Sequence, residues 1–490
     1  MKFRKHYLQD YLKLEGAKVK TFFDNPNNLI TGDGMSKELS YFLDEILMVK
    51  DYVAAYEESS DAWTIEFSTP QYNSFEEFAN DIGGLCFISD MEAKCCLRSI
   101  PRLSIGLFKV YPEYAFPYLL PQHFYMLQAI CREFDIDLPN IPSDNVARFG
   151  YYLDICRAMY DFRVRNGLSP SEMCAFIYGF ALRDVRQMLA DCDKTPSRIF
   201  MVYASPTDQE KVLSGELKSD AICIWQGREN MRIGDLVLMY ERAPSSGFAS
   251  VWKAVSPGFD DPFDLYPGKV FLGNPVKFPH VSFNKLADDP VWGGKSEVKA
   301  NMQGGSGRVC SVKEYEALKA LIHKEDSSFD LDKLPKPPTE AVFDFGALEV
   351  EHDVEVKLLE PLLVNLGFKV GDWVCQYSVR IGRDNASRPD YVIGLKESVR
   401  GHATADLVFE AKHTIPNKRQ REKDYGQALA YAGILSARIA TLVSKEGIWI
   451  YKREDNFDFD KGEEYSWAEL EKPDVIAKLG CMYRPNMLAE

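Results

Sequence analysis

The sequence predicts a multidomain α/β protein with a helical domain first, a β-barrel-like domain in the middle and a mixed α/β domain last. The chain has 490 residues, which is too long for one core and suits about three domains. Hydrophobic residues make up 46% and charged residues 27%, a balance typical of globular proteins. The hydrophobic pattern also changes along the chain from a helical period to short β-rich runs and then to a mixture. We therefore place domains at 1–195, 196–325 and 343–490, with a linker at 326–342.

Residues 1–195 carry the helical pattern. The segments Phe149 to Gly167 and Ser169 to Asp191 have apolar residues at i, i+3, i+4 and i+7. Ser169 and Glu172 form a capping-box pattern, with Pro170 at the first helical position. The region contains no phosphate loop, metal cluster or catalytic triad in its sequence, so scaffolding, dimerisation and partner contact all stay open for it.

Features that mark secreted or membrane proteins are missing from the sequence. The N-terminal segment has no apolar stretch typical of a signal peptide, and no later run approaches 18 apolar residues. The 11 cysteines are odd in number and include no C-x-x-C pair. We expect a cytoplasmic protein with reduced thiols and without a zinc site.

The middle domain is predicted from short β-rich runs separated by Gly, Pro, Ser and Asp. Their spacing is typical of a small β-barrel or strongly bent sheet, closed by a helix from Lys313 to His323. The runs are Arg198 to Ser205, Ala221 to Gln226, Asp235 to Glu241, Phe248 to Val255 and Lys269 to Phe278. The polar segment Asp326 to Val342 follows, and Pro337-Pro338 favours an extended linker there.

The last domain is predicted to run helix, strand, strand, strand, helix, strand. The expected elements are Val354 to Leu366, Lys369 to Val379, Asp390 to Leu395, Ala405 to Lys412, Tyr425 to Ala437 and Ile439 to Tyr451. Asp390 and Glu410 are equidistant from Arg400, which lies in a loop rich in Gly, Ser and charge. An antiparallel hairpin turning there would place the two carboxylates side by side.

A catalytic centre is expected at this hairpin. Lys412 lies two residues after Glu410 on the same strand, so both side chains face the same way. Two carboxylates can bind Mg²⁺ or Mn²⁺, and the ammonium group can orient or help deprotonate a water molecule. This combination suits phosphodiester hydrolysis.

Neighbouring residues are predicted to assist. Glu355 or Glu360, on the preceding helix, would support the metal, and we favour Glu355. Gln427 and Tyr431 lie at i, i+4 on a later helix and would orient phosphate or the lysine. The chain has a net charge of −15, but basic residues surround the carboxylates. We expect phosphate contacts from Arg388, Lys418, Arg419 and Arg421.

The ordered motifs resemble the PD-(D/E)XK nuclease superfamily, and especially the nuclease domain of type I restriction-enzyme motor subunits. They are E-x-K-x-x-x-P-L-L-x-x-L-G-F from Glu355, R-P-D ending at Asp390, E-A-K from Glu410 and Q-A-x-x-Y-A from Gln427. The resemblance covers about a hundred residues. It implies a restriction-endonuclease-like fold in which Asp390, Glu410 and Lys412 are catalytic, with Glu355 and Gln427 assisting. The sequence has no phosphate loop, so ATP-driven translocation by this chain is not expected.

The middle domain resembles the EVE branch of the PUA-like fold. The resemblance rests on G-D-x-V-L-M-Y from Gly234, on Trp225 before it and on the Gly-rich loop before the closing helix. It implies an aromatic pocket for a modified base turned out of the stack. Trp225 is the first candidate for stacking, followed by Tyr240 and Trp252; Phe248 and Trp292 are the other aromatics. Candidate readers of the base edge are Asn230, Ser205 and Asn301.

The combination of a reader and a nuclease favours a modification-dependent restriction endonuclease in defence against phage. Its partner would be DNA with modified bases, and cleavage of both strands would require a homodimer. One alternative is a repair or RNA-processing nuclease. Another is a nucleic-acid-binding adaptor with an inert nuclease fold.

Overall fold

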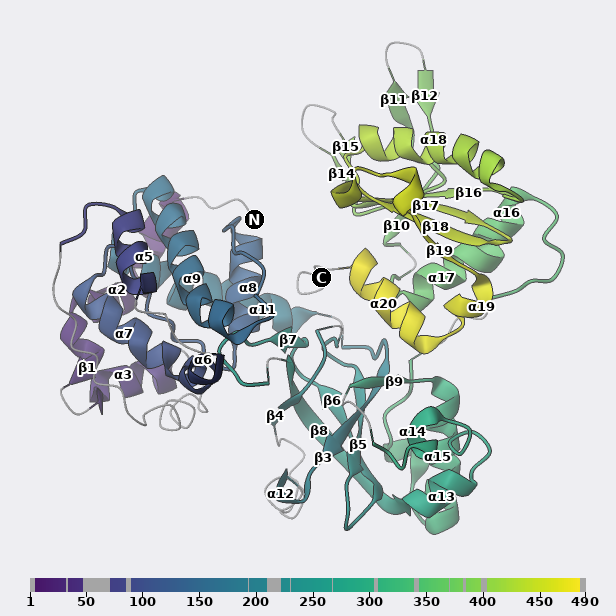
Figure 1. Cartoon of the computed structure of the whole chain (residues 1–490), viewed down its shortest axis with the longest axis horizontal. Coiled ribbons are helices and arrows are strands. Elements are labelled where there is room, and N and C mark those ends of the chain that lie inside the picture. Colours follow the sequence, from purple (N-terminus) through teal and green to yellow (C-terminus); the bar gives the residue numbers. More distant parts are fainter. Residues whose placement is uncertain are drawn as a thin grey trace.

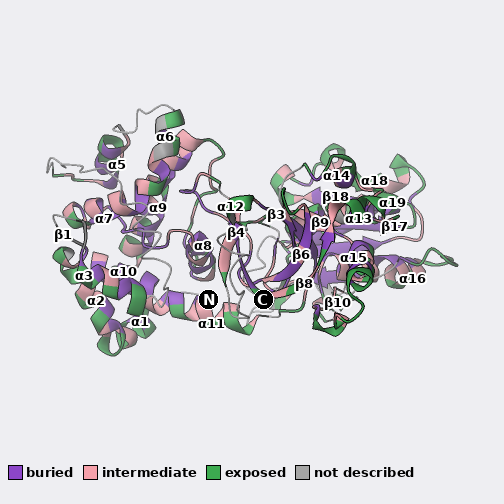
Figure 2. Cartoon of the chain, turned by 90° about the horizontal axis from the view of Figure 1, so that it is seen from below, coloured by how far each residue is buried: buried purple, intermediate pink, exposed green. Residues whose placement is uncertain are grey.

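The computed structural model has three parts, joined in chain order (Figure 1). It describes residues 5–31, 34–46, 71–84, 90–192, 194–208, 222–229, 231–266, 268–303, 307–338, 343–369, 371–381, 385–397 and 403–484. A helical N-terminal region leads into a curled sheet, and a second sheet flanked by helices follows. Buried residues concentrate inside each part (Figure 2). The coarse prediction of a multidomain α/β chain with helices first is confirmed.

The N-terminal part is a helical assembly around one core. Its main helices are α1 (Lys5–Lys13), α2 (Gly16–Asp24), α3 (Lys37–Tyr41), α5 (Phe75–Gly84), α6 (Asp90–Cys96), α7 (Ile100–Val110), α8 (Phe124–Glu133), α9 (Asn145–Asn166), α10 (Pro170–Ala175) and α11 (Leu182–Asp191). A π-helical turn, η4 (Phe176–Ala181), joins α10 to α11. The predicted capping box is confirmed: Ser169 N donates to Glu172 at 2.8 Å and Glu172 N donates to Ser169 Oγ at 3.2 Å.

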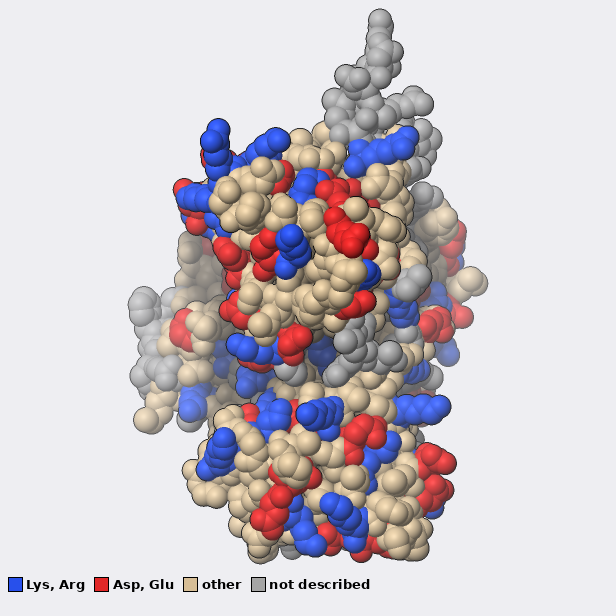
Figure 3. Space-filling model, turned by 90° about the vertical axis from the view of Figure 1, so that its right-hand side faces the viewer, with Lys and Arg blue, Asp and Glu red and all other residues tan. Residues whose placement is uncertain are grey.

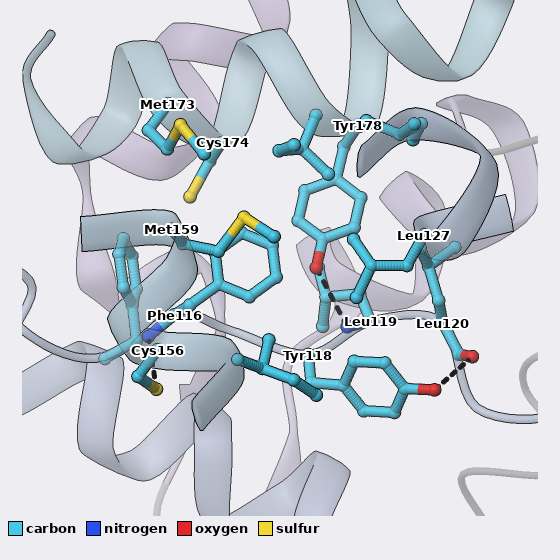
Figure 4. Packing of buried hydrophobic residues seen from close by; sticks show 14 of the residues in the cluster. Phe116, Tyr118, Leu119, Leu120, Leu127, Cys156, Met159, Met173, Cys174 and Tyr178 are labelled. Carbon is cyan, nitrogen blue, oxygen red and sulfur yellow. Dashed lines mark hydrogen bonds between the residues drawn. The ribbon is translucent and has the colours of Figure 1, made fainter. Parts of the chain in front are cut away.

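Tyr178 and the segment 116–120 form the centre of that core (Figure 4). Leu119 N donates to the Tyr178 hydroxyl at 3.0 Å, and the Tyr118 hydroxyl donates to Leu120 O at 2.8 Å. Phe116 N donates to the free thiol of Cys156 at 3.4 Å, and burial raises the pKa of that thiol to about 12. A buried thiol with a raised pKa is unreactive, so Cys156 is a core residue here.

The middle part is built on a seven-stranded sheet with the order β4-β8-β6-β5-β3-β9, where β7 also pairs with β8. The strands are β3 (Ile199–Ala204), β4 (Cys223–Gln226), β5 (Leu236–Glu241), β6 (Gly247–Ala254), β7 (Phe259–Asp260), β8 (Gly268–Ser282) and β9 (Arg308–Cys310). Alternate residues of β3 and β5 enter different cores on the two faces of the sheet. The helices α13 (Phe283–Asp288), α14 (Ser296–Lys299) and α15 (Val312–Glu325) contribute to one of these cores, and α15 contains the predicted closing helix.

The segment predicted as a linker begins as part of the middle domain. Leu334 is buried in the core beneath α15, and the Tyr315 hydroxyl donates to Pro335 O at 2.8 Å. The polar, proline-rich composition predicted an extended connection, but Phe329 and Leu331 also pack against this core. Residues 339–342 lie outside the described residues. The packed part of 326–342 therefore extends the middle domain to at least Pro335.

The C-terminal part contains a six-stranded sheet with the order β10-β13-β16-β17-β18-β19. Its strands are β10 (Trp373–Cys375), β13 (Tyr391–Ile393), β16 (Leu407–Ala411), β17 (Ile439–Ser444), β18 (Gly447–Lys452) and β19 (Glu463–Tyr465). Only β16 and β17 pair in parallel among these described strands. α16 (Glu351–Val354), the π-helical turn η7 (Glu355–Leu359) and α17 (Glu360–Asn365) run on from one another, while α18 (Lys418–Ile434), α19 (Trp467–Leu470) and α20 (Pro473–Tyr483) complete the part.

Two predicted elements of this part are corrected. The single strand predicted over 439–451 is a hairpin, because the chain turns at Lys445 and Glu446 and β18 returns antiparallel to β17. The helix predicted from Tyr425 begins earlier, at Lys418, because the Asn417 side chain caps it by accepting from Gln420 N at 3.0 Å. Among the described helices, none has the length and apolar character needed to cross a bilayer.

Candidate active site at the β13–β16 hairpin

The predicted hairpin brings Asp390 and Glu410 together. β13 and β16 pair antiparallel with Tyr391 opposite Phe409, and continuing that register by one residue places Asp390 opposite Glu410. The short strands β14 (Lys396–Glu397) and β15 (Ala403–Thr404) keep the same register toward the turn. The turn itself, with Arg400, lies outside the described residues. The prediction of neighbouring carboxylates on adjacent strands is confirmed.

Asp390 is held in place by two hydrogen bonds. Ala411 N donates to one carboxylate oxygen at 2.8 Å and Gln376 Nε2 donates to the other at 2.9 Å. The side chain is buried, with 6% of its surface exposed. Each oxygen keeps a second lone pair, so the carboxylate of Asp390 is held in an orientation in which it could bind a cation.

Glu410 and Lys412 are in direct contact. Lys412 Nζ lies 2.8 Å from Glu410 Oε1, 2.7 Å from Ala411 O and 3.6 Å from Glu351 Oε2. Burial alone would lower the pKa of Lys412, but the carboxylates of Glu410 and Glu351 outweigh it and hold the pKa above its ordinary value. The lysine is therefore a cation at neutral pH. The same-face prediction for Glu410 and Lys412 is confirmed.

Glu410 lies in an unfavourable environment for a lone anion. Burial, followed by the negative charge of Asp390, raises the pKa of Glu410 to about 8, although Lys412 opposes the shift. Its Oε2 is buried without a hydrogen-bond partner among the described residues. A buried acceptor without a donor costs stability unless another positive group reaches it. A divalent cation beside Asp390 would supply that charge, so the residues present fit a metal ion.

Three carboxylates can meet at one point. Glu351, Glu355 and Asp390 each offer an oxygen, and these oxygens all lie within 4.8 Å of one another. Such hard oxygen ligands suit Mg²⁺ or Mn²⁺. Glu351 was not predicted from the sequence as a candidate ligand. Its i, i+4 spacing from Glu355 could have indicated it, because this spacing puts both side chains on one helix face. His352 contacts Glu355 at 2.9 Å from the exposed side.

The alternative ligand Glu360 is engaged elsewhere. The Tyr391 hydroxyl donates to Glu360 Oε1 at 2.9 Å. Glu360 is also absent from the carboxylate group that can meet at one point among the described residues. The geometry therefore favours Glu355, as the sequence predicted. Glu360 instead joins its helix to β13.

The assisting residues on α18 are paired with each other. Gln427 Nε2 donates to the Tyr431 hydroxyl at 3.2 Å, which confirms their predicted common face. Tyr431 is 5% exposed and belongs to the core between α18 and the sheet. Because the ring is buried, the contact that the structure shows for Tyr431 is with Gln427 and not with the surface. A contact between Gln427 and Lys412 stays a prediction.

The predicted phosphate ligands divide into two pairs. Arg388 and Arg419 are exposed. Lys418 lies 2.9 Å from Asp460, and Arg421 lies 2.8 Å from Glu464. Phosphate contact by Lys418 or Arg421 would have to replace these surface ion pairs, which are worth only about 0–1 kcal/mol. All four stay predictions.

The aromatics proposed for base binding lie on different faces of the middle sheet. Tyr240 and Phe248 belong to the core beneath α15, whereas Trp225 and Trp252 belong to the core on the other face. Trp252 and Trp292 are fully buried; their indole N–H groups donate to Ser250 Oγ at 3.1 Å and Glu314 O at 3.0 Å. A single cage cannot contain both sets. A base cannot stack on Tyr240 or Trp252 while they occupy these cores, and sequence alone could not assign the faces.

The remaining candidates differ in exposure and position. Trp225 is 8% exposed, Ser205 is half-buried just after β3, and Asn301 is exposed. Asn230 lies outside the described residues. A base-binding role for Trp225, Ser205 and Asn230 stays a prediction.

The chain matches no family model, and no curated protein matches it. Among solved structures, the chain is similar to the NMR structure of Rpa0253 from Rhodopseudomonas palustris, at 15% sequence identity. The match covers 27% of this chain and 95% of that chain, with a TM-score of 0.23. A score this low supports no inference about fold or function.

Proposed function

We propose that the chain is a metal-dependent DNA endonuclease whose catalytic centre is formed by Asp390, Glu410 and Lys412. The observation that carries the proposal is the convergence of a hydrogen-bonded aspartate, a buried glutamate with an unpartnered oxygen and a lysine ammonium. Glu351 and Glu355 bring further carboxylate oxygens to Asp390. Such a concentration of anionic ligands beside one cation suits metal-assisted phosphodiester hydrolysis.

The residues divide the chemistry among them. Asp390 and Glu355 would hold Mg²⁺ or Mn²⁺, with Glu351 or Glu410 completing the ligand set. When bound, the metal ion would polarise the phosphate and lower the pKa of an attacking water. Lys412 would orient that water and stabilise negative charge on the phosphate oxygens. Gln427, held by Tyr431, is proposed to support the position of the lysine or the phosphate.

We further propose that the enzyme cuts DNA carrying modified bases, in defence of a cell against phage. The proposal rests on the joining of a curled β-sheet domain, with its resemblance to base readers, to the candidate nuclease. Two chains are proposed to act together, because one hairpin provides one catalytic centre per chain. The alternative assignments, repair or RNA processing and an inert adaptor, are separated from this one by the substrate tests that follow.

Purified full-length protein should cut DNA containing hydroxymethylated or glucosylated cytosine in the presence of Mg²⁺ and should spare unmodified DNA. Both substrates, of equal length, should be compared by gel electrophoresis with Mg²⁺ and with EDTA. Equal cutting of both substrates would contradict the proposed preference for modified DNA but support the proposed nuclease activity. Failure to cut either, or structured RNA, with Mg²⁺ or Mn²⁺ would contradict the nuclease proposal.

Replacing Glu351 or Glu355 with glutamine should weaken metal binding. Loss of one carboxylate from the group of three should raise the Mg²⁺ concentration for half-maximal cutting by roughly 10–100-fold. The measurement is a Mg²⁺ titration of the initial cutting rate. Glu360→Gln is the matched control on the same helical segment, since Glu360 bonds Tyr391 instead, and it should leave the Mg²⁺ requirement unchanged. The same increase in the control would contradict the ligand set.

A further inference from the structure

A cavity of about 710 Å³ lies where the three parts of the chain meet. Helix α8 and the loop 136–141 line it from the helical part, while the loop around Met231 and strand β7 line it from the middle part. Helix α20 closes it from the C-terminal part. Figure 3 shows Lys and Arg side chains along the seam between the C-terminal part, above, and the middle part, below. The cavity is thus completed only when all three parts are packed together.

Four arginines line this cavity, and three of them, Arg198, Arg232 and Arg484, lie close enough for their charges to interact. Burial, followed by the positive charges of Arg484 and Arg198, lowers the pKa of Arg232 to about 9, although the carboxylate of the buried Asp235 opposes the shift. Like charges held close together in a partly buried site repel one another. An anion between them would relieve that repulsion and would accept charge-assisted hydrogen bonds.

Arg232 also spans the boundary between two parts. Its Nη1 and Nη2 donate to Gly367 O and Leu366 O, each at 3.4 Å, which are long and weak bonds. Its Nε is buried without a hydrogen-bond partner among the described residues. A guanidinium group buried in this way has donor capacity to spare. Arg232 therefore has a buried donor that an anion could satisfy.

A glycine in α20 makes room for the cluster. A Cβ atom at Gly480 would lie 1.9 Å from Arg198 Nη2, so the guanidinium approaches the helix where only glycine allows it. Glycine within a helix costs about 1 kcal/mol relative to alanine. The close approach of Arg198 therefore explains why glycine occupies position 480 despite this cost.

Two carboxyl groups line the same cavity. Glu229 and Asp260 lie close together, and burial, followed by the negative charge of Asp260, raises the pKa of Glu229. Burial likewise raises the pKa of Asp260. The two neighbouring carboxyl groups bring acceptor oxygens to the cavity. The cavity therefore presents anion-binding and base-edge-binding groups together.

We propose that this cavity binds one nucleotide unit, with its phosphate at Arg198, Arg232 and Arg484 and an amino-bearing base at Glu229 and Asp260. Carboxylates accept from the exocyclic amine of cytosine, and arginines match phosphate geometry. The volume falls within the range of small-molecule sites, roughly 300–1,000 Å³. A base extruded from DNA would be such a ligand. The assignment extends the proposed nuclease function by naming where DNA is read.

The cavity is physically connected to the catalytic hairpin. Gly480 and Arg484 border the cavity at the end of α20, and Tyr483 of the same helix stacks on Phe409, with ring centroids 5.4 Å apart. Phe409 precedes Glu410 on β16. Helix α20 thus contacts both the cavity and the strand that carries Glu410.

The test is direct binding to the metal-free, full-length protein in EDTA, measured by calorimetry. The probes are dCMP, deoxycytidine, dTMP and the single-stranded trinucleotide dTdCdT. We expect dCMP or the trinucleotide to bind at least about 10-fold more tightly than deoxycytidine, since the phosphate contacts are charge-assisted. If dCMP binds, a single free nucleotide is a sufficient ligand for the cavity. If only the trinucleotide binds, the ligand has to be part of a nucleic-acid chain. Weaker binding of dTMP than of dCMP is expected from the carboxyl pair.

Two variants test the arginine cluster from different elements. Arg232→Met removes the central charge, and Gly480→Ala forces the Arg198 guanidinium to move while favouring the α20 helix. Each should weaken binding about 10-fold. Gly433→Ala is the matched control, because a Cβ there meets nothing within 4 Å. Unchanged affinity in both variants, or no binding of dCMP or trinucleotide to the folded wild type, would overturn the assignment. Metal-free binding is independent of cutting, so a failed nuclease assay leaves this result interpretable.

Discussion

Lys412→Ala should reduce the rate of DNA cutting by about 10²–10⁴-fold, the range for loss of a group that orients water or stabilises transition-state charge. Lys412 is the cation closest to Glu410, at 2.8 Å, and also neighbours Glu351 at 3.6 Å. Its removal leaves the buried carboxylate without its counter-ion. DNA binding should be nearly unchanged, because this side chain is mostly enclosed by the catalytic carboxylates. Initial cutting rates and a gel-shift assay on the same substrate give the two quantities.

The loss has to be separated from a loss of metal binding. Without Lys412, the pKa of Glu410 should rise further, and Mg²⁺ would bind less tightly at neutral pH. A Mg²⁺ titration distinguishes the two: recovery at high Mg²⁺ means that the lysine only supports the metal, and persistent loss means that it acts on the reaction. Lys412→Arg restores the charge with a different geometry. Lys445→Ala, on the exposed β17–β18 turn, should cut normally. Normal cutting by Lys412→Ala would contradict the assignment of the site.

The β13–β16 hairpin and its pair of carboxylates could be predicted because the residues that determine them are close in sequence. Asp390 and Glu410 are equidistant from a turn-forming loop, and strand geometry then determines which side chains meet. The i, i+4 pair Gln427 and Tyr431 follows equally from helix geometry. Glu351 was missed because the helix begins earlier than its apolar pattern indicates, at Glu351 itself.

Other features depended on packing that a sequence pattern does not contain. Tyr240 and Trp252 lie in cores on opposite faces of one curled sheet, so the pattern identified strands without identifying which aromatics share a surface. The arginine cluster combines Arg198, Arg232 and Arg484, which are far apart in sequence. Its recognition required the relative placement of the three parts. The positions of the helices and strands could largely be predicted from the sequence, whereas the contacts between distant segments that form the cavity could not.

Glu410→Gln should abolish cutting and, in the absence of metal, stabilise the protein. The pKa of Glu410 is raised to about 8 in the folded protein from an ordinary 4.5, so ionisation favours the unfolded state. Below pH 4.5 both states bind the proton and the penalty disappears; it grows as pH rises toward 8. Glutamine resembles the protonated side chain and removes the penalty. The gain should reach about 2–3 kcal/mol at pH 7 and vanish near pH 4.

The gain is measured from unfolding curves in EDTA at several pH values, with Glu446→Gln as a control of opposite sign. Glu446 accepts hydrogen bonds from Thr414, Ser444 and Ile415 N. Burial opposes its ionisation, but these bonds prevail and lower the pKa of its carboxyl group. Its ionised form therefore stabilises the fold, and Glu446→Gln should destabilise the protein at neutral pH. If Glu410→Gln were also destabilising at pH 7, the buried glutamate would be a structural anion paired with Lys412. If it is stabilising and inactive, the protein retains a carboxylate that costs it stability, as expected where the charge serves to hold a metal ion.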